Sequence, residues 1–264
     1  MTSLDEALRN IQQRYNEYLS KPFDREISPS DDMANSWDVD NAHYFAVGAG
    51  AVELIFEAMF LCRVSGFRRI LDMPCGFGRV TRHLRAAFPE AAINACDLYQ
   101  DRIDFCGDRL GALPIKSQED FDQIKFPTTY DLIWCGSLLT HLTAPQFQSA
   151  LNLFIRALSP NGIAVVTLHG RHSIHIQHNK WKYLPDEDFR LIEWQYYSTG
   201  FGYADYKMPD RFFEQKSYGV SVSTPAYVLR CLEKDESIRI KGYMERRWDD
   251  HQDALIIQKT ALNA

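Results

Sequence analysis

Apolar and polar residues alternate along the chain in a way that predicts strands and helices in turn. Short apolar runs indicate buried strands at residues 69–75, 91–98, 112–117, 130–136 and 163–169. Between these runs, apolar residues recur every three or four positions, as in amphipathic helices, over residues 78–88, 100–107 and 144–158. This alternation predicts an α/β fold with a doubly wound, mostly parallel sheet.

The two ends of the chain depart from this alternation. Helical periodicity covers residues 5–20 and 48–64, on either side of a polar, proline-containing loop at 21–42. At the other end, a helix at 225–234 precedes strands at 238–245 and 254–259. Only about eight residues and no helix join these two strands, so they must run antiparallel. We therefore expect a seven-stranded sheet that ends in an antiparallel hairpin.

The stretch between the fifth strand and the helix at 225–234 has weak periodicity and is rich in aromatic and charged residues. We interpret residues 171–222 as an inserted lid. The expected organisation is an N-terminal helical cap over residues 1–66 and a Rossmann-like domain over residues 67–264 that carries this insertion.

Composition narrows the class of protein. The 264 residues are 45% hydrophobic and 24% charged, as in ordinary globular proteins, and the formal net charge of −6 argues against nucleic-acid binding. Six scattered cysteines without a CxxC pair predict a reduced, cytoplasmic protein. The polar N-terminus does not resemble a signal peptide, and we expect no apolar run of the ~18 residues that a membrane span requires.

The first strand, the turn after it and the next helix carry the motif Asp72-x-x-x-Gly76-x-Gly78. The two glycines permit a tight turn and let a ligand approach the backbone. In a doubly wound sheet, ligands bind at the carboxyl ends of the strands. Asp97 ends the next strand, 19 residues beyond Gly78. Its carboxylate could accept hydrogen bonds from ribose hydroxyls or cap the helix that follows.

With this motif and its reversed last strand, the chain resembles the class I S-adenosylmethionine (SAM)-dependent methyltransferases. The resemblance covers residues 68–170 motif by motif and residues 224–260 by topology. It implies S-adenosyl-L-methionine as the cofactor. The site residues that it implies are Asp72, Pro74, Cys75, Gly76, Gly78, Asp97, Leu98, Ser117, Gln118, Gly136 and Ser137.

The resemblance also implies a role for several of these residues. Gly76 and Gly78 would lie under the methionine and ribose, and Asp72 would face the methionine amino group, directly or through water. Asp97 would hold the ribose, and Leu98 would touch the adenine, near Ser117 and Gln118. Residues 45–50, just before the second helix, could close over the cofactor.

Two alternatives to this family remain open. A dinucleotide-binding NAD-dependent oxidoreductase would carry Gly-x-Gly-x-x-Gly, but Thr81 stands at the third glycine position. A domain that binds SAM without catalysis, as a scaffold, is also compatible with the motif.

Three further stretches point to an acceptor class. Cys135–Leu142, Tyr218–Ser221 and Trp248–Asp253 resemble a subgroup of bacterial methyltransferases associated with surface polysaccharides or glycosyl transfer. This implies O-methylation of a small-molecule or glycan-like acceptor, and a hydroxyl acceptor needs a base that removes its proton.

Histidines at the ends of strands are the candidate bases. His141 follows the fourth strand, although it could instead be a packing residue, and His169 ends the fifth. His251 lies in the hairpin turn, where Asp249 or Asp250 could orient it, unless this turn is merely polar and solvated.

Four histidines recur at every third position, which raises the question of a metal site. His169, His172, His175 and His178 could bind a metal, touch the substrate from the lid, or be solvated. A spacing of three rotates by ~60° per step around a helix, so four such side chains would not converge on one ion. We predict no metal site. The sequence gives no indication of the oligomeric state.

Overall fold

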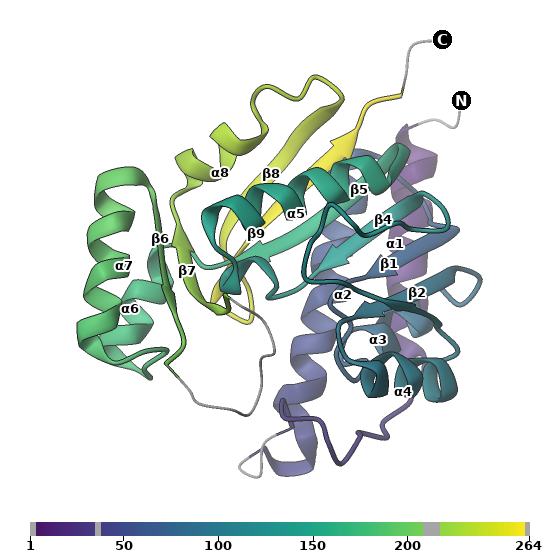
Figure 1. Cartoon of the computed structure of the whole chain (residues 1–264). Coiled ribbons are helices and arrows are strands. Elements are labelled where there is room, and N and C mark those ends of the chain that lie inside the picture. Colours follow the sequence, from purple (N-terminus) through teal and green to yellow (C-terminus); the bar gives the residue numbers. More distant parts are fainter. Residues whose placement is uncertain (1–3, 35–37, 208–216, 262–264) are drawn as a thin grey trace.

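A computed structural model of the chain describes residues 4–34, 38–207 and 217–261 (Figure 1). Its main sheet has the order β3-β2-β1-β4-β5-β9-β8. The strands are β1 (Arg69–Asp72), β2 (Ala92–Asp97), β3 (Leu113–Lys116), β4 (Tyr130–Cys135), β5 (Leu158–Leu168), β8 (Ile238–Trp248) and β9 (Gln252–Lys259). In this sheet β9 is the strand whose direction is reversed relative to the other six, so the prediction of a mostly parallel seven-stranded sheet with a terminal antiparallel hairpin is confirmed.

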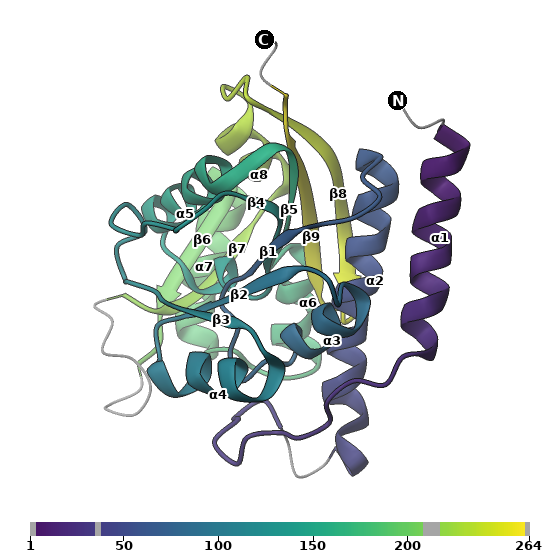
Figure 2. The ribbon, with the colours of Figure 1, turned by 90° about the vertical axis from the view of Figure 1, so that its right-hand side faces the viewer.

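Helices cover both faces of this sheet (Figure 2). One face packs against α1 (Leu4–Ser20), α2 (Ala42–Cys62), α3 (Thr81–Ala87) and α4 (Gln100–Leu110), and the other against α5 (Ala144–Ala157) and α8 (Pro225–Leu232). Successive side chains of a strand point to opposite faces, so Ile70 lies in one hydrophobic core and its neighbour Leu71 in the other. Strands buried on both faces explain the continuous apolar runs in the sequence.

The second helix begins earlier than the sequence predicts. It starts at Ala42, directly after a short 3-10 helix (Val39–Asn41), because the Asp38 carboxylate accepts hydrogen bonds of 2.8 Å from the backbone N–H groups of His43 and Tyr44. Residues 45–50 therefore lie inside α2. The expectation that they form a segment that closes over the cofactor is wrong.

Helix α2 contradicts the expectation that no apolar run is long enough to span a membrane. By length and composition, Val39–Cys62 is apolar enough to cross a membrane, and it is the one such helix found in the described residues. However, 61% of its most apolar window is buried inside the structure, against α1, α3 and β8. Its composition is therefore accounted for by its place in the core.

The insertion contains more regular structure than its sequence pattern indicates. It forms α6 (Arg171–Asn179), α7 (Asp186–Thr199) and a two-stranded antiparallel ribbon of β6 (Phe201–Asp205) and β7 (Gly219–Ser223), seen beside the main sheet in Figure 1. Phe189, Ile192 and Val222 belong to a small core of its own. The periodicity is weak because Trp194 and Tyr197 on α7 are exposed, so the apolar positions do not mark one buried face. The domain boundary at residue 66 stays a prediction.

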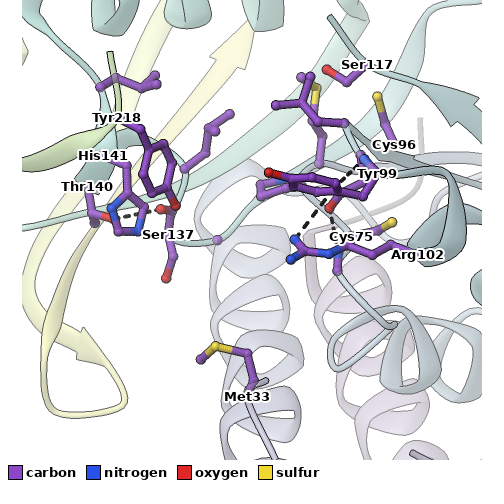
Figure 3. A pocket seen from close by; sticks show the side chains of 18 of the residues that line it. Met33, Cys75, Cys96, Tyr99, Arg102, Ser117, Ser137, Thr140, His141 and Tyr218 are labelled. Carbon is purple, nitrogen blue, oxygen red and sulfur yellow. Dashed lines mark hydrogen bonds and ion pairs between the residues drawn. The ribbon is translucent and has the colours of Figure 1, made fainter. Parts of the chain in front are cut away.

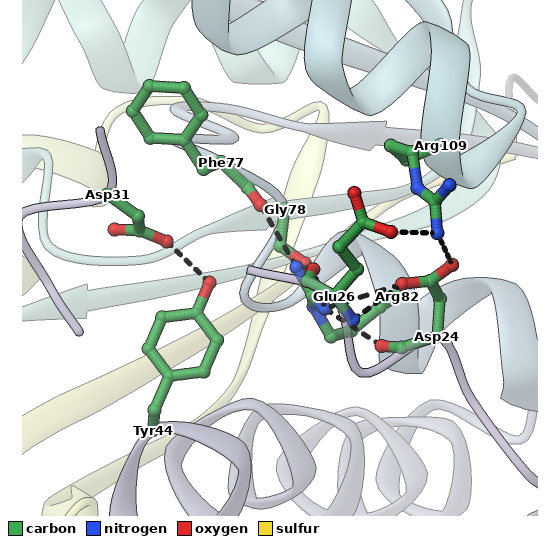
Figure 4. Close-up of polar contacts among 8 residues, drawn as sticks. All are labelled: Asp24, Glu26, Asp31, Tyr44, Phe77, Gly78, Arg82 and Arg109. Carbon is green, nitrogen blue, oxygen red and sulfur yellow. Dashed lines mark hydrogen bonds and ion pairs between the residues drawn. The ribbon is translucent and has the colours of Figure 1, made fainter. Parts of the chain in front are cut away.

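An N-terminal strap, residues 21–34, is tied to the turn after β1 by one buried arginine (Figure 4). The Arg82 guanidinium donates to the carbonyls of Asp24 and Glu26 in the strap, both at 2.8 Å. It also donates to the carbonyls of Phe77 and Gly78 in the turn, at 3.2 and 3.0 Å. One side chain therefore satisfies four backbone acceptors from two segments that are far apart in the sequence.

Replacing Arg82 by methionine is expected to lower the free energy of unfolding by about 3–5 kcal/mol, because buried carbonyls would lose their donors. Urea unfolding of the variant beside the wild type would measure this loss. Arg109→Met is the matched control. Arg109 pairs with the carboxylates of Asp24 and Glu26 but is 41% exposed, so its loss should cost less than about 1 kcal/mol. Equal losses in the two variants would contradict the role given to Arg82.

Candidate functional site

A cavity of about 610 Å³ opens at the carboxyl ends of β1, β2, β4 and β5. This is the edge of a doubly wound sheet at which ligands bind, and the volume suits a cofactor-sized molecule. Figure 3 shows two groups of side chains across the cavity. Cys75, Cys96, Tyr99, Arg102 and Ser117 form one end, which we call the cofactor end. Ser137, Thr140, His141 and Tyr218 belong to the other, the acceptor end.

The structure brings most of the predicted site residues together around this cavity. The predicted residues on its wall are Pro74, Cys75, Gly76, Asp97, Leu98, Ser117, Gln118, Gly136, Ser137, His141, His169 and His251. Asp72 and Gly78 are not on the wall. What each residue binds stays a prediction.

The two glycines of the turn serve different purposes. Gly76 has a φ of +51°, and an added Cβ would meet nothing within 4 Å. Gly78 has a φ of +77°, and its Cβ would lie 2.3 Å from Leu110 Cδ1 on α4. Gly76 therefore leaves open space at the cavity wall, whereas Gly78 allows the turn to pack against α4.

Asp97 holds the turn after β1 and faces the cavity at the same time. Its carboxylate accepts hydrogen bonds from the backbone N–H of Gly76, at 3.0 Å, and of Tyr99, at 3.1 Å. Burial raises the pKa of this carboxyl, and Arg102 at 3.7 Å opposes the rise. A carboxylate has about four acceptor positions, so capacity remains for ligand hydroxyls. The N-cap position of α4 is Tyr99 and not Asp97, so the alternative that Asp97 caps this helix is wrong.

Asp72 lies beneath the turn and is 1% exposed. The Thr81 hydroxyl donates to its Oδ2 at 2.6 Å, while Oδ1 is buried without a partner among the described residues. Burial raises the pKa of this carboxyl to about 7. A buried acceptor without a donor calls for an explanation. An ammonium group, or a water that bridges to one, would supply the missing donor, so the site fits a cofactor with a methionine portion.

At the acceptor end, three residues form a closed ring of hydrogen bonds that includes one backbone N–H group. The Ser137 N–H donates to Thr167 Oγ1 at 2.9 Å, the Thr167 hydroxyl donates to Gln252 Oε1 at 2.6 Å, and Gln252 Nε2 donates to Ser137 Oγ at 2.7 Å. The ring joins the end of β4 to β5 and β9 and holds Ser137 at a φ of +60°. Because Ser137 Oγ is an acceptor in this ring, its own proton stays available for a ligand.

The candidate bases lie at the same end, but their surroundings differ. His251 Nε2 lies 2.5 Å from the Tyr183 hydroxyl, and its ring stacks on that of His169, with ring centres 5.2 Å apart. His141 Nδ1 lies 2.8 Å from the carbonyl oxygen of Gly219. Burial lowers the pKa of His141 and of His251 to about 4, and that of His169 well below its usual value. All three imidazoles are therefore neutral near pH 7.

The hypothesis that a neighbouring carboxylate orients His251 is wrong. Asp249 lies 3.5 Å from His43, and Asp250 pairs with Arg246. Both aspartates lie in the tight turn between β8 and β9 and have a positive φ. The group that orients His251 is the Tyr183 hydroxyl from the insertion.

The four histidines spaced by three do not converge. His172 and His175 stack on α6, with ring centres 5.5 Å apart, whereas His178 pairs with Glu193 on α7. His169 is not part of α6 and faces the cavity. Over the described ranges, no group of three metal-ligating side chains is close enough to hold an ion. The helix geometry explains this divergence.

Several residues on the cavity wall were not predicted from the sequence. Tyr99 stands two residues after Asp97, and an aromatic side chain so close to the acid of a cofactor motif is a signal in the sequence. Gln252 stands beside a predicted residue in the hairpin. No local sequence pattern marks Tyr183 or Arg79 as a cavity residue. Tyr183 lies in the insertion, and Arg79 follows the glycine motif without being part of it.

Comparison with known proteins agrees with this geometry. Residues 70–162 match the family model of a methyltransferase domain. Among curated proteins, the malonyl-[acyl-carrier protein] O-methyltransferase of Anoxybacillus flavithermus is 30% identical over 115 residues, which is 43% of this chain and 44% of that protein. The enzyme of the same name from Bacillus anthracis is 29% identical over 120 residues, 45% and 44% of the two chains. The match thus spans less than half the length of these relatives.

Solved structures share the fold at low sequence identity. DesVI from Streptomyces venezuelae has a TM-score of 0.56 at 14% identity, over 87% of this chain and 99% of that one. A SAM-dependent methyltransferase from Clostridium acetobutylicum has a TM-score of 0.54 at 12% identity, over 86% and 98%. These likenesses establish the fold.

We expect replacement of Asp72 by asparagine to change how stability depends on pH. The wild-type carboxyl ionises near pH 4 when unfolded and at about 7 when folded, so rising pH favours unfolding over this interval. Asparagine does not ionise and can still accept from Thr81. The stability of the variant relative to wild type should therefore rise by about 1.4 kcal/mol per pH unit between pH 4 and 7 and then level off. Urea unfolding of the cofactor-free proteins at several pH values would measure it, and a pH-independent difference would contradict the raised pKa.

Replacement of Asp97 by alanine should weaken binding of S-adenosylhomocysteine at least about 100-fold, because two hydrogen bonds to a charged acceptor are lost. Isothermal calorimetry would measure the affinity. Asp101→Ala, at an exposed position in the first turn of α4, is the control and should bind as the wild type does. Unchanged affinity in the Asp97 variant would remove this carboxylate from the cofactor site.

Proposed function

We propose a specific reaction for this chain, which carries a class I S-adenosylmethionine-dependent methyltransferase domain. The family predicted from the Asp72-x-x-x-Gly76-x-Gly78 motif is confirmed by the match of residues 70–162 to a methyltransferase domain, and the similar structures share its fold. SAM is the cofactor that this family uses. The proposed reaction is O-methylation of a hydroxyl group on a small-molecule or glycan-like acceptor. The proposed location is the cytoplasm, in keeping with six cysteines that are all free.

The observation that carries this proposal is the protonation state and hydrogen bonding of the His141 ring. A carbonyl oxygen only accepts hydrogen bonds, so its short contact with Gly219 requires the proton on Nδ1. With a pKa of about 4 the ring is neutral, and Nε2 then has a free lone pair. Among the described residues Nε2 has no hydrogen-bond partner, yet it is not one of the enclosed atoms, and His141 lines the cavity. A hydroxyl acceptor could bind against this lone pair.

The other two histidines are less suitable as the base. In His251, the Nε2 atom is already bonded to Tyr183. In His169, Nδ1 is enclosed and out of reach of a ligand. We therefore give the role of base to His141 and treat the His251–Tyr183 pair as part of the wall that positions the acceptor.

The cofactor and the protein would contribute differently to the reaction. When bound, SAM supplies an electrophilic methyl group on a sulfonium, so the donor is already activated. The chain's own task is to orient the acceptor oxygen and to exclude water from it. His141 Nε2 would take the hydroxyl proton as the oxygen gains its methyl group, and the proton would later pass to solvent.

A carboxylate acceptor is the second candidate, because the curated relatives are named as methyltransferases of a malonyl group. Such an acceptor needs no base, but it needs a cation that holds it. The two arginines on the described cavity wall are already surrounded by acids. Arg102 lies 3.7 Å from Asp97, and Arg79 lies within electrostatic range of Asp31, Asp32 and Asp249. The neutral, aromatic acceptor end suits a hydroxyl better than an anion.

Replacing His141 by glutamine should lower turnover with hydroxyl acceptors by about 100-fold or more while S-adenosylhomocysteine binds as in the wild type. Formation of S-adenosylhomocysteine from a panel of sugars, phenols and carboxylic acids would measure it. His172→Gln is the matched control, since His172 lies on α6 away from the cavity wall.

Three outcomes would speak against the proposal. Turnover with carboxylic acids alone would favour the second candidate. Cofactor binding without turnover of any acceptor would favour a non-catalytic scaffold. Unchanged turnover of the His141 variant with hydroxyl acceptors would exclude His141 as the base.

A further inference from the structure

The outer edge of strand β7 faces the main sheet, although β7 belongs to the insertion. On its inner side β7 pairs with β6, and the Tyr206 N–H donates to the carbonyl of Tyr218 at 3.0 Å. In an antiparallel pair, successive residues direct their backbone groups alternately toward the partner and away from it. Residues 218, 220 and 222 therefore face β6, and residues 219, 221 and 223 present their backbone groups on the outer edge.

Both histidines that follow β4 and β5 are bound to this outer edge. The Gly219 carbonyl accepts from His141 Nδ1 at 2.8 Å, and the Ser221 backbone lies near the His169 ring, where it opposes the fall in the pKa of that histidine. The Ser223 N–H in turn donates to the backbone carbonyl of His169 at 2.9 Å. The three alternate residues thus all bind the same two loops of the main sheet.

A side-chain hydrogen bond also holds β7 against the loop after β4. The Ser221 hydroxyl donates to the carbonyl of Leu139 at 2.7 Å, in the short 3-10 helix that contains His141. The Tyr218 ring also stacks on the His141 ring, with centres 4.6 Å apart and planes at 19°. The Tyr206 hydroxyl lies 3.5 Å from His141 Nδ1, too far to compete with the bond to Gly219.

We infer that strand β7 is a positioning element of the methyl-transfer site, and that its Gly219 carbonyl fixes the tautomer and orientation of His141. This inference rests on the proposed role of His141 as the base. Without the carbonyl, the ring could carry its proton on either nitrogen and could rotate. His141 can therefore act as a base only when the insertion is docked on the end of the main sheet. Docking of the insertion thus affects the rate of methyl transfer as well as the access of the acceptor to the cavity.

The tautomer can be read directly from the nitrogen-15 resonances of the imidazole rings near pH 7, with His141→Gln to assign the signal. We expect His141 in the wild-type protein to carry its proton on Nδ1 and not on Nε2. A proton on Nε2 would overturn the inference. This measurement needs neither an acceptor nor a destabilising substitution.

Two glycines of the ribbon give a matched pair of variants. A Cβ on Gly219 would lie 2.0 Å from the Ala204 carbonyl oxygen, so Gly219→Ala must displace the start of β7. A Cβ on Gly202 would lie 2.1 Å from the Ile192 carbonyl oxygen, so Gly202→Ala makes an equal clash on the far side of the ribbon, toward α7. The two variants strain the same insertion, but only the first displaces the carbonyl that binds His141.

Gly219→Ala is expected to lower turnover about 10-fold or more, with a mixture of His141 tautomers and unchanged affinity for S-adenosylhomocysteine. Gly202→Ala should keep the wild-type tautomer and most of the turnover. Equal losses in both variants with an unchanged tautomer would overturn the inference. If His141→Gln itself retains turnover, the base assignment fails, whereas the tautomer measurement still decides whether β7 fixes the ring.

Discussion

The constraint on which this structure depends is that buried backbone groups must find hydrogen-bond partners where regular elements end. The carboxyl edge of the sheet is such a place, because every strand stops there and a loop begins. Asp97 accepts from the amide of Gly76, Arg82 donates to the carbonyls of Phe77 and Gly78, and the ring around Ser137 binds the loop after β4. The side chains that satisfy these groups also shape the cavity, so the same residues stabilise the fold and form the site.

The two ends of the cavity differ in charge because their partners differ. At the cofactor end, Asp97 on the wall is held by backbone amides, and Asp72 beneath the turn is held by the Thr81 hydroxyl. They suit a ligand that brings hydroxyl and ammonium donors. At the acceptor end, buried histidines are neutral because burial disfavours their charged form. A neutral imidazole is the form that can accept a proton from a hydroxyl group.

Much of the fold could be predicted because a strand buried on both faces leaves a continuous apolar run, which the sequence displays openly. The cofactor end could also be predicted from the sequence, since the glycine turn and the acid at the end of the next strand are local patterns. The structure of the insertion could not be predicted from the sequence. Its helices expose Trp194 and Tyr197, and its ribbon is held by contacts with distant loops. Residue identities alone could not show that Tyr183 pairs with His251, or that Asp249 and Asp250 do not.

By itself, the sequence determined the order of the elements, the antiparallel hairpin and the family of the domain, because each depends on local pattern or on short connections. The tertiary structure decided which nitrogen of His141 carries a proton, which oxygen of Asp72 lacks a donor, and how the insertion reaches the cavity. These depend on backbone carbonyls and amides, which every residue carries. Their positions are therefore absent from the sequence and appear only once the chain is folded.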